Sequence, residues 1–289
     1  MKKSVLAVAV AALVASTAST AATVYDKDGT TLAIGGRIEA LLGSTHTGYV
    51  QHSDTSLNDR VRLNFRGSTK ITDGISAYGF WEQNWEHKAD SSNPGNDFRY
   101  AYVGVNFGEF GDLRFGRWEQ ALDWVTNVTD KIEEIGGASA CFGDNRQSGQ
   151  IGYEWNGYGV TFGLRYQTAV NSGNQDLGVK EDVDSGFGVY AGYTSPDVLF
   201  GPISIRVGYL YEKYQYDEKD VAAKIIDISD DDGYADYDYN LKNAKTFAVG
   251  LSWGNHGKGP YIGAEYSYQK NKITNQKVVP YNYNRCRCP

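Results

Sequence analysis

Gly149-Gln-Ile-Gly-Tyr-Glu-Trp155 and Val160-Thr-Phe-Gly-Leu-Arg-Tyr166 are the two stretches that decide the fold of this chain. In each stretch every second residue is apolar, and the residues between them are small, polar or charged. A period of two places alternate side chains on opposite faces of a β-strand. Only residues 156–159 separate the two stretches, so together they predict two strands joined by a tight turn, with one apolar face.

The same alternation recurs along the chain and predicts eleven strands. A soluble β-sandwich would show this period as well. The connections between the strands distinguish a sandwich from a barrel. They alternate between short turns and long loops, which is the arrangement of an outer-membrane β-barrel. Several predicted strands carry Tyr or Trp near their ends, as the aromatic girdles of a membrane interface do. The predicted strands are residues 31–43, 60–69, 74–87, 98–107, 111–117, 147–156, 159–168, 186–195, 201–212, 244–254 and 259–270.

The N-terminus predicts export. Residues 1–21 combine a basic start, a short apolar run from Val5 to about Ala15 and small residues at the exit, which is the pattern of a secretory signal peptide. The mature chain is then expected to begin at Ala22. No later stretch approaches the 18 apolar residues of a transmembrane helix candidate, so any entry into a membrane has to use strands.

Composition excludes several other classes. The formal net charge is −7, and nucleic acid is not expected as a partner because phosphate binding needs a basic surface. The three cysteines, Cys141, Cys286 and Cys288, form no disulfide framework, and a single C-x-C is too little for a zinc site. The acidic stretch 227–238 does not fit the EF-hand spacing. We therefore expect no metal and no cofactor.

Four blocks of sequence resemble a known family. They are residues 22–29 (ATVYDKDG), 61–67 (VRLNFRG), 102–117 (YVGVNFGEFGDLRFGR) and 132–137 (IEEIGG). They resemble the general diffusion porins of Gram-negative outer membranes, from the signal peptide to about residue 270. The resemblance implies an all-β fold, a transmembrane antiparallel barrel of the 16-stranded type, of which about eleven strands are present. Residues 22–270 would form these strands, with an inward-folded third loop at residues 118–146.

The resemblance also implies a pore constriction in which basic residues on the wall face acids on the third loop. The residues matching this pattern are Arg37, Arg62, Arg99, Arg146, Asp130 and Glu134. Periodicity independently places Arg37 in step with Glu39 and Arg62 with Asn64, and it places Arg99 opposite Phe98, Tyr100 and Tyr102. The alternative is that these arginines are structural and pair with neighbouring carboxylates.

The function implied by the resemblance is passive diffusion of small hydrophilic solutes and ions through a water-filled channel. Expected partners are outer-membrane lipid, lipopolysaccharide and two further copies in a homotrimer. Glu39, Glu82 and Glu154 on the polar face suggest a weak preference for cations. A sugar-selective porin is the main alternative, suggested by the many aromatic residues. An enzyme or an adhesin is disfavoured, because none of His46, His52, His87 and His256 stands beside a catalytic partner.

The end of the sequence departs from the family pattern. The predicted strands stop five short of sixteen, and residues 271–289 alternate poorly and end in Cys286-Arg-Cys-Pro289. We therefore expect an aberrant tail over residues 271–289, which a truncated or frameshifted gene would produce. A sheet that does not close would expose strand edges that hydrocarbon does not tolerate, so a truncated product without channel function is the other alternative.

Overall fold

The computed structural model describes residues 21–43, 56–87, 95–131, 146–170, 183–215 and 241–273. Residues 1–20 of the predicted signal peptide, the three cysteines and Glu134 lie outside these ranges. The chain divides into two compact units. The first comprises residues 1–120 and 146–163, and the second comprises residues 121–145 and 164–289.

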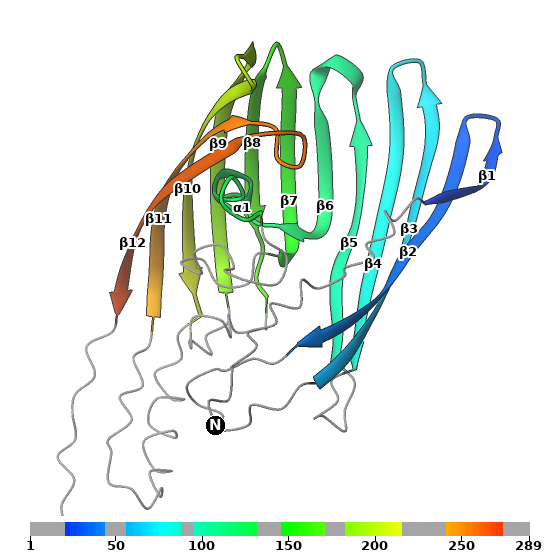
Figure 1. Cartoon of the computed structure of the whole chain (residues 1–289), viewed down its shortest axis with the longest axis horizontal. Helices are drawn as coiled ribbons and strands as arrows, with labels where there is room; N and C mark the ends of the chain where they lie inside the picture. Colours follow the sequence, from blue (N-terminus) through cyan, green and yellow to red (C-terminus); the bar gives the residue numbers. More distant parts are fainter. Residues whose placement is uncertain are drawn as a thin grey trace, which may run out of the picture. The chain divides into compact units, whose positions relative to one another are not determined.

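The described part of the first unit is an antiparallel sheet whose strands follow chain order (Figure 1). A single 3-10 turn, η1 (Gly108–Phe110), lies between its fifth and sixth strands. The strand β8 (Val160–Gln167) begins in this unit and ends in the second. The other strands are β1 (Ala22–Lys27), β2 (Thr30–Gly43), β3 (Ser56–Thr72), β4 (Ile75–His87), β5 (Gly95–Asn106), β6 (Asp112–Glu119) and β7 (Arg146–Gly157).

Cross-strand register turns the period of two into two distinct faces. Ile38, Val61 and Trp85 are neighbours on β2, β3 and β4, and their side chains are 74%, 39% and 38% exposed. The next row, one residue along each strand, holds Arg37, Arg62 and Asn84. Because neighbouring residues on a strand point to opposite faces, the sheet carries an exposed apolar face and a polar face. An apolar face of this extent needs a cover other than water.

A tight turn creates a strand that the sequence pattern did not predict. Asp28 and Gly29 both have positive φ, 51° and 72°, which is the two-residue turn that suits the twist of a hairpin. This turn pairs β1 with β2 from Ala22↔Ile34 to Lys27↔Thr30. The described residues therefore form twelve strands, where the pattern predicted eleven.

The described part of the second unit contains four further antiparallel strands and one short helix. They are α1 (Asp123–Thr126), β9 (Val183–Val198), β10 (Gly201–Tyr214), β11 (Leu241–Gly254) and β12 (Tyr261–Ile273). The strand β12 runs three residues into the range predicted as an aberrant tail; residues 274–289 lie outside the described part of the chain. Within the described residues no helix combines the length and hydropathy needed to cross a membrane.

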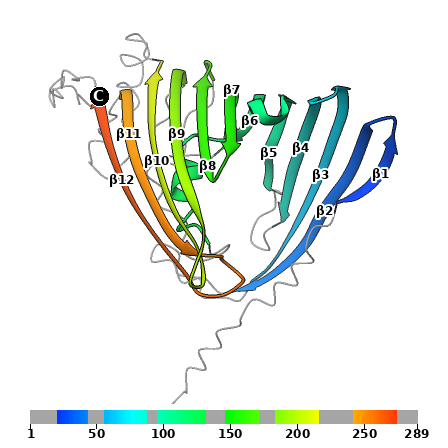
Figure 2. The same cartoon turned by 90° about the horizontal axis from the view of Figure 1, so that it is seen from above.

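The larger hydrophobic cluster of the second unit lies where α1 contacts β10 and β11. Figures 1 and 2 show this helix on one side of the strands. Leu122 and Val125 are fully buried against Tyr190 of β9 and Ala248 of β11. The opposite face of these strands exposes apolar side chains, among them Ile205 (48%) and Tyr266 (63%). The segment that follows β6 therefore lies on the face away from the exposed apolar side chains.

Candidate functional site

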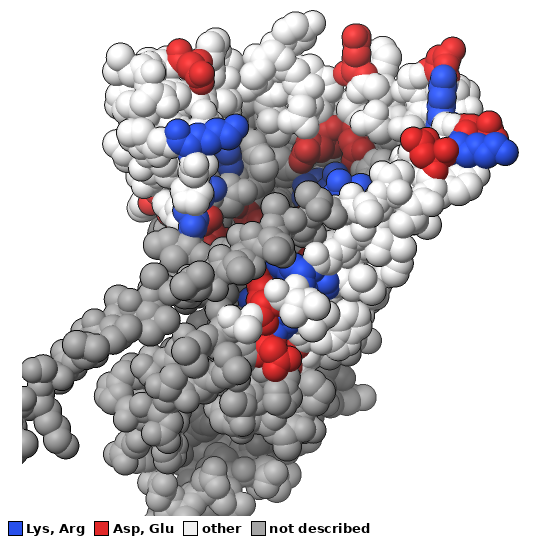
Figure 3. All heavy atoms as spheres, turned by 45° about the vertical axis from the view of Figure 1, so that its right-hand side comes forward, with Lys and Arg blue, Asp and Glu red and all other residues white. Residues whose placement is uncertain are grey.

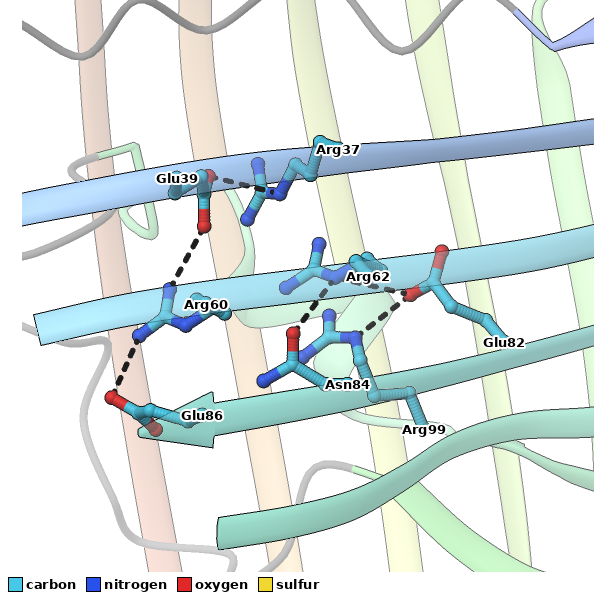
Figure 4. A network of polar contacts seen from close by, with 8 residues as sticks. All are labelled: Arg37, Glu39, Arg60, Arg62, Glu82, Asn84, Glu86 and Arg99. Carbon is cyan, nitrogen blue, oxygen red and sulfur yellow. Dashed lines mark hydrogen bonds and ion pairs between the residues drawn. The ribbon is translucent and has the colours of Figure 1, made fainter. Parts of the chain in front are cut away.

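Three strands of the first unit bring arginines together on the polar face, as Figure 4 shows. Arg37 of β2 and Arg62 of β3 are direct partners in the ladder. Arg99 of β5 joins them through a bulge, because the register with β4 shifts between Glu82↔Tyr100 and Gln83↔Phe98. A bulge leaves one residue unpaired and can re-aim its side chain. Arg99 thereby reaches Glu82 on the polar face.

This bulge corrects one prediction. Periodicity placed Tyr100 and Tyr102 on the face opposite Arg99. In the structure, Tyr100 is the ladder partner of Glu82 on the polar face, and the Arg99 guanidinium carbon lies 5.8 Å from the centroid of the Tyr100 ring. Only Phe98, 44% exposed, keeps the expected orientation among the apolar residues. A strict period of two cannot detect an extra residue in one strand, which is why the prediction was wrong.

Two buried glutamates each bridge a pair of arginines (Figure 4). The Glu39 carboxylate lies 2.9 Å from Nε of Arg37 and 3.4 Å from Nη1 of Arg60. The Glu82 carboxylate lies 2.8 Å from Nε of Arg99 and 3.7 Å from Nε of Arg62. Arg60 and Arg99 donate hydrogen bonds to these carboxylates, and charge-assisted hydrogen bonds hold guanidinium groups in fixed orientations.

Two more residues complete the network that Figure 4 draws. Arg60 also contacts the Glu86 carboxylate at 3.5 Å, and Arg62 donates to the side-chain oxygen of Asn84 at 3.4 Å. Among the eight residues of this network, four arginines face three glutamates, which leaves one positive charge in excess. Sequence reasoning had not assigned Arg60, Asn84 or Glu86 to the site. Arg60 is nevertheless in phase with Arg62, so the period contained the signal.

Arg146 joins this group through an aromatic ring. Its guanidinium carbon lies 5.4 Å from the centroid of the Tyr100 ring, which also contacts Arg99. The Tyr100 hydroxyl donates a hydrogen bond to Glu119. A ring with a cation near its face stabilises that cation through its quadrupole. The four predicted wall arginines therefore share one face of the first unit.

The predicted acids are not tested in the same way. Asp130 belongs to the second unit, where it follows α1 and is exposed, and Glu134 lies outside the described residues. Next to Asp130, burial is the main cause that lowers the pKa of Lys131; the charge of Arg206 lowers it further, and Asp130 acts in the opposite direction. The pairing of these acids with the wall arginines stays a prediction.

An aromatic patch adjoins the arginines on the same face. It consists of Tyr78, Phe80, Tyr100, Tyr102 and Trp118, whose neighbouring ring centroids lie 5.5–6.4 Å apart. Arg114 lies over the rings of Tyr102 and Trp118 at 4.8 and 5.6 Å.

Charged side chains of both signs lie close together on the surface, beside a broad uncharged area (Figure 3). Within the described residues, no three His, Cys, Asp or Glu side chains are placed to hold a metal ion. The neighbouring positive and negative side chains are suited to orienting polar solutes by charge.

Comparison with known proteins identifies relatives. A family model described as Gram-negative porin matches residues 7–283. Outer membrane porin protein OmpD of Citrobacter koseri is 32% identical over 286 residues, which cover 95% of this chain and 72% of the relative. Outer membrane protein F of Serratia marcescens is 31% identical over 204 residues, covering 67% of this chain and 53% of the relative.

The fold has a counterpart among solved structures. The structure of Salmonella typhi OmpF in complex with daunomycin aligns with a TM-score of 0.63 at 19% identity, covering 87% of this chain and 69% of that chain. The chain thus spans about half the length of several curated relatives that it matches.

Proposed function

Because this chain belongs to the Gram-negative porin family, we propose that it serves as an outer-membrane channel for the passive diffusion of small hydrophilic solutes and ions. The observation that carries the proposal is the division of the strands into an apolar face and a polar face. Ile38, Val61 and Trp85 form an exposed apolar row, and Arg37 with Arg62 lies one residue along on the polar face. Such alternation suits a wall between lipid and water.

The arginine network is the proposed wall of the pore constriction. Arg37, Arg62, Arg99 and Arg146 would face solutes, and Asp130 and Glu134 would lie on the opposing loop. Charges of opposite sign across a narrow gap create a field that orients polar solutes and disfavours apolar ones. Changes at these residues should therefore alter selectivity more than folding.

We include a weak cation preference in this proposal. Glu39 and Glu82 each contact two arginines, so their charge is locally compensated. The preference would then depend on Asp130 and Glu134 and on the acidic excess of the whole chain. A salt gradient across a planar bilayer tests it, because an anion-selective reversal potential would refute a cation preference.

A sugar-selective channel is the second candidate, and the aromatic patch favours it. Four of its rings, those of Tyr78, Phe80, Tyr100 and Tyr102, are partly exposed on the polar face and offer apolar surfaces to the faces of sugar rings, whereas Trp118 is buried beneath them. Transient block of single-channel current by an oligosaccharide would support this candidate; unaltered current would support the general channel. Family membership decides against the enzyme considered from the sequence.

We further propose that the channel assembles as a homotrimer in contact with outer-membrane lipid and lipopolysaccharide. The direct test of the channel itself is reconstitution of the purified chain into planar bilayers. Stepwise current increments in salt solution would support it, and a bilayer that stays insulating after verified insertion would refute it.

A further inference from the structure

The segment Ala121–Thr129, which we call the seated segment, lies on the strands of the second unit through a specific set of contacts. Arg206 of β10 donates from Nη1 to the backbone oxygen of Trp124 at 2.8 Å and to the side-chain oxygen of Asn127 at 2.6 Å. Its guanidinium carbon also lies 4.6 Å from the centroid of the Trp124 ring. One side chain therefore holds the segment by two charge-assisted hydrogen bonds and a cation–π contact.

The strand β12 holds the following residues of the segment. The Tyr261 hydroxyl donates to the backbone oxygen of Val128 at 2.7 Å. The Thr129 hydroxyl donates to the Glu265 carboxylate at 2.9 Å. Both contacts join positions more than 130 residues apart in the chain. They therefore fix the segment to a strand that is distant in sequence.

Glycines on the strands make the space for this contact. A Cβ built on Gly192 would lie 2.6 Å from the Trp124 ring, and one on Gly208 would lie 2.7 Å from a Leu122 methyl group. A Cβ on Gly250 would overlap the backbone oxygen of Val125, and one on Gly263 would overlap that of Val128. A side chain at Gly250 or Gly263 would meet the backbone of the segment and has to move it away from the strands, whereas at Gly192 and Gly208 the side chains of Trp124 and Leu122 would have to shift.

The register shows that these residues form a row across the sheet. Gly192, Arg206, Gly250 and Glu265 are successive ladder partners on β9, β10, β11 and β12. Along this row the two charged residues, Arg206 and Glu265, therefore alternate with two glycines. Arg206 and Glu265 reach the segment, and the glycines let its backbone lie directly on the sheet.

We propose that this row, with Arg206 as its main positioning residue, sets how far the seated segment stands from the wall. Asp130 comes directly after the segment, so the row also positions the first of the proposed constriction acids. Only this last step, from position to solute selectivity, rests on the proposed function. The position of the segment itself is a separate claim and has its own readout.

Hydrogen–deuterium exchange with mass spectrometry on the full chain in lipid vesicles tests whether the row holds the seated segment in place. The amides of Val125, Thr126 and Asn127 bond within the seated segment, to the backbone oxygens of Leu122 and Asp123. Arg206→Met removes both hydrogen bonds from a charged donor, so it should speed exchange of a 121–131 peptide by about tenfold or more. Arg206→Lys should fall between Arg206→Met and the wild type, because it keeps the charge and loses the planar fork.

Two further variants keep the test decisive if Arg206→Met fails to fold. Tyr261→Phe removes only the hydroxyl that bonds Val128, and it should speed exchange in the same peptide while β2 and β3 peptides stay unchanged. Gly79→Ala is the matched control for Gly250→Ala, because its added Cβ would meet nothing nearer than 3.7 Å. Unchanged exchange in Tyr261→Phe and Gly250→Ala would overturn the proposal.

Single-channel conductance then separates the two claims. Gly250→Ala should push the seated segment off the wall by about 1 Å, the distance needed to relieve the overlap, and should lower conductance relative to Gly79→Ala. If neither the wild type nor any variant conducts, the proposed function fails. The exchange result still decides whether the row positions the seated segment. If the variants have the same conductance and the same reversal potential in a salt gradient while exchange differs, the link from the position of the segment to selectivity is refuted.

Discussion

Replacing Glu82 by glutamine tests the electrostatic role of the arginine network. The Glu82 carboxylate contacts Arg99 at 2.8 Å and Arg62 at 3.7 Å, and only 11% of its side chain is exposed. Glutamine keeps the shape and one acceptor oxygen, so the local packing is preserved. The network of Figure 4 then changes from one excess positive charge to two.

The size of the effect follows from Coulomb's law. A unit charge about 6 Å from a passing monovalent ion changes its energy by about 0.7 kcal/mol in a medium with the dielectric constant of water. Because 1.4 kcal/mol corresponds to a factor of ten, the anion occupancy beside the network should rise by about threefold in dilute salt. At about 0.15 M salt the screening length of ~8 Å should reduce the energy by about half.

The assay is the reversal potential of the reconstituted channel in a salt gradient, measured in dilute and in physiological salt. The matched control is Asp73→Asn, which makes the same charge change at a fully exposed turn beside Lys70. Glu82→Gln should shift selectivity toward anions by about threefold in dilute salt and less at higher salt, and the control should not. Equal reversal potentials for the two variants would refute the electrostatic reasoning.

Three further predictions concern the same site. The double variant Asp130→Asn with Glu134→Gln should shift the reversal potential toward anions, and unchanged selectivity would argue against the assignment of the loop acids. Glu39→Ala should lower the free energy of unfolding by about 1–3 kcal/mol in urea titrations, because Arg60 loses a hydrogen-bond acceptor and Arg37 loses its ion pair with the same carboxylate. Gly36→Ala should lower it by about 1–3 kcal/mol, because its Cβ would overlap a backbone oxygen of β3, whereas Gly67→Ala, with 3.8 Å to the nearest atom, should have little effect.

The faces of the strands could be predicted from the sequence because they depend on local order alone. Ile38, Val61 and Trp85 belong to runs whose period of two survives along most of each strand. The same period placed Arg37 and Arg62 on the other face, where the ladder makes them direct partners. The resemblance to the family added Arg146, which the structure brings beside Tyr100.

Other features depend on how strands pair, and a single sequence does not contain that register. The bulge at Arg99 reversed the expected side of Tyr100, because one extra residue shifts every later position on the strand. Strand β1 was missed because all six of its residues are exposed and it is set by the turn at Asp28 and Gly29. From the sequence alone, Gly192 and Gly250 are ordinary small residues of their strands. Only the register shows that they are the two ladder partners of Arg206.

Position-specific spin labelling tests the division into a lipid face and a water face most directly. In a background without cysteines, labels at Asn64 and Phe65, which are neighbours in the middle of β3, are compared in lipid vesicles. The label at Phe65 should relax with oxygen, which dissolves in lipid, and the label at Asn64 with a water-soluble nickel chelate. Both labels shielded from both reagents, as in a dry protein interior, or the opposite pairing of labels and reagents, would contradict the account.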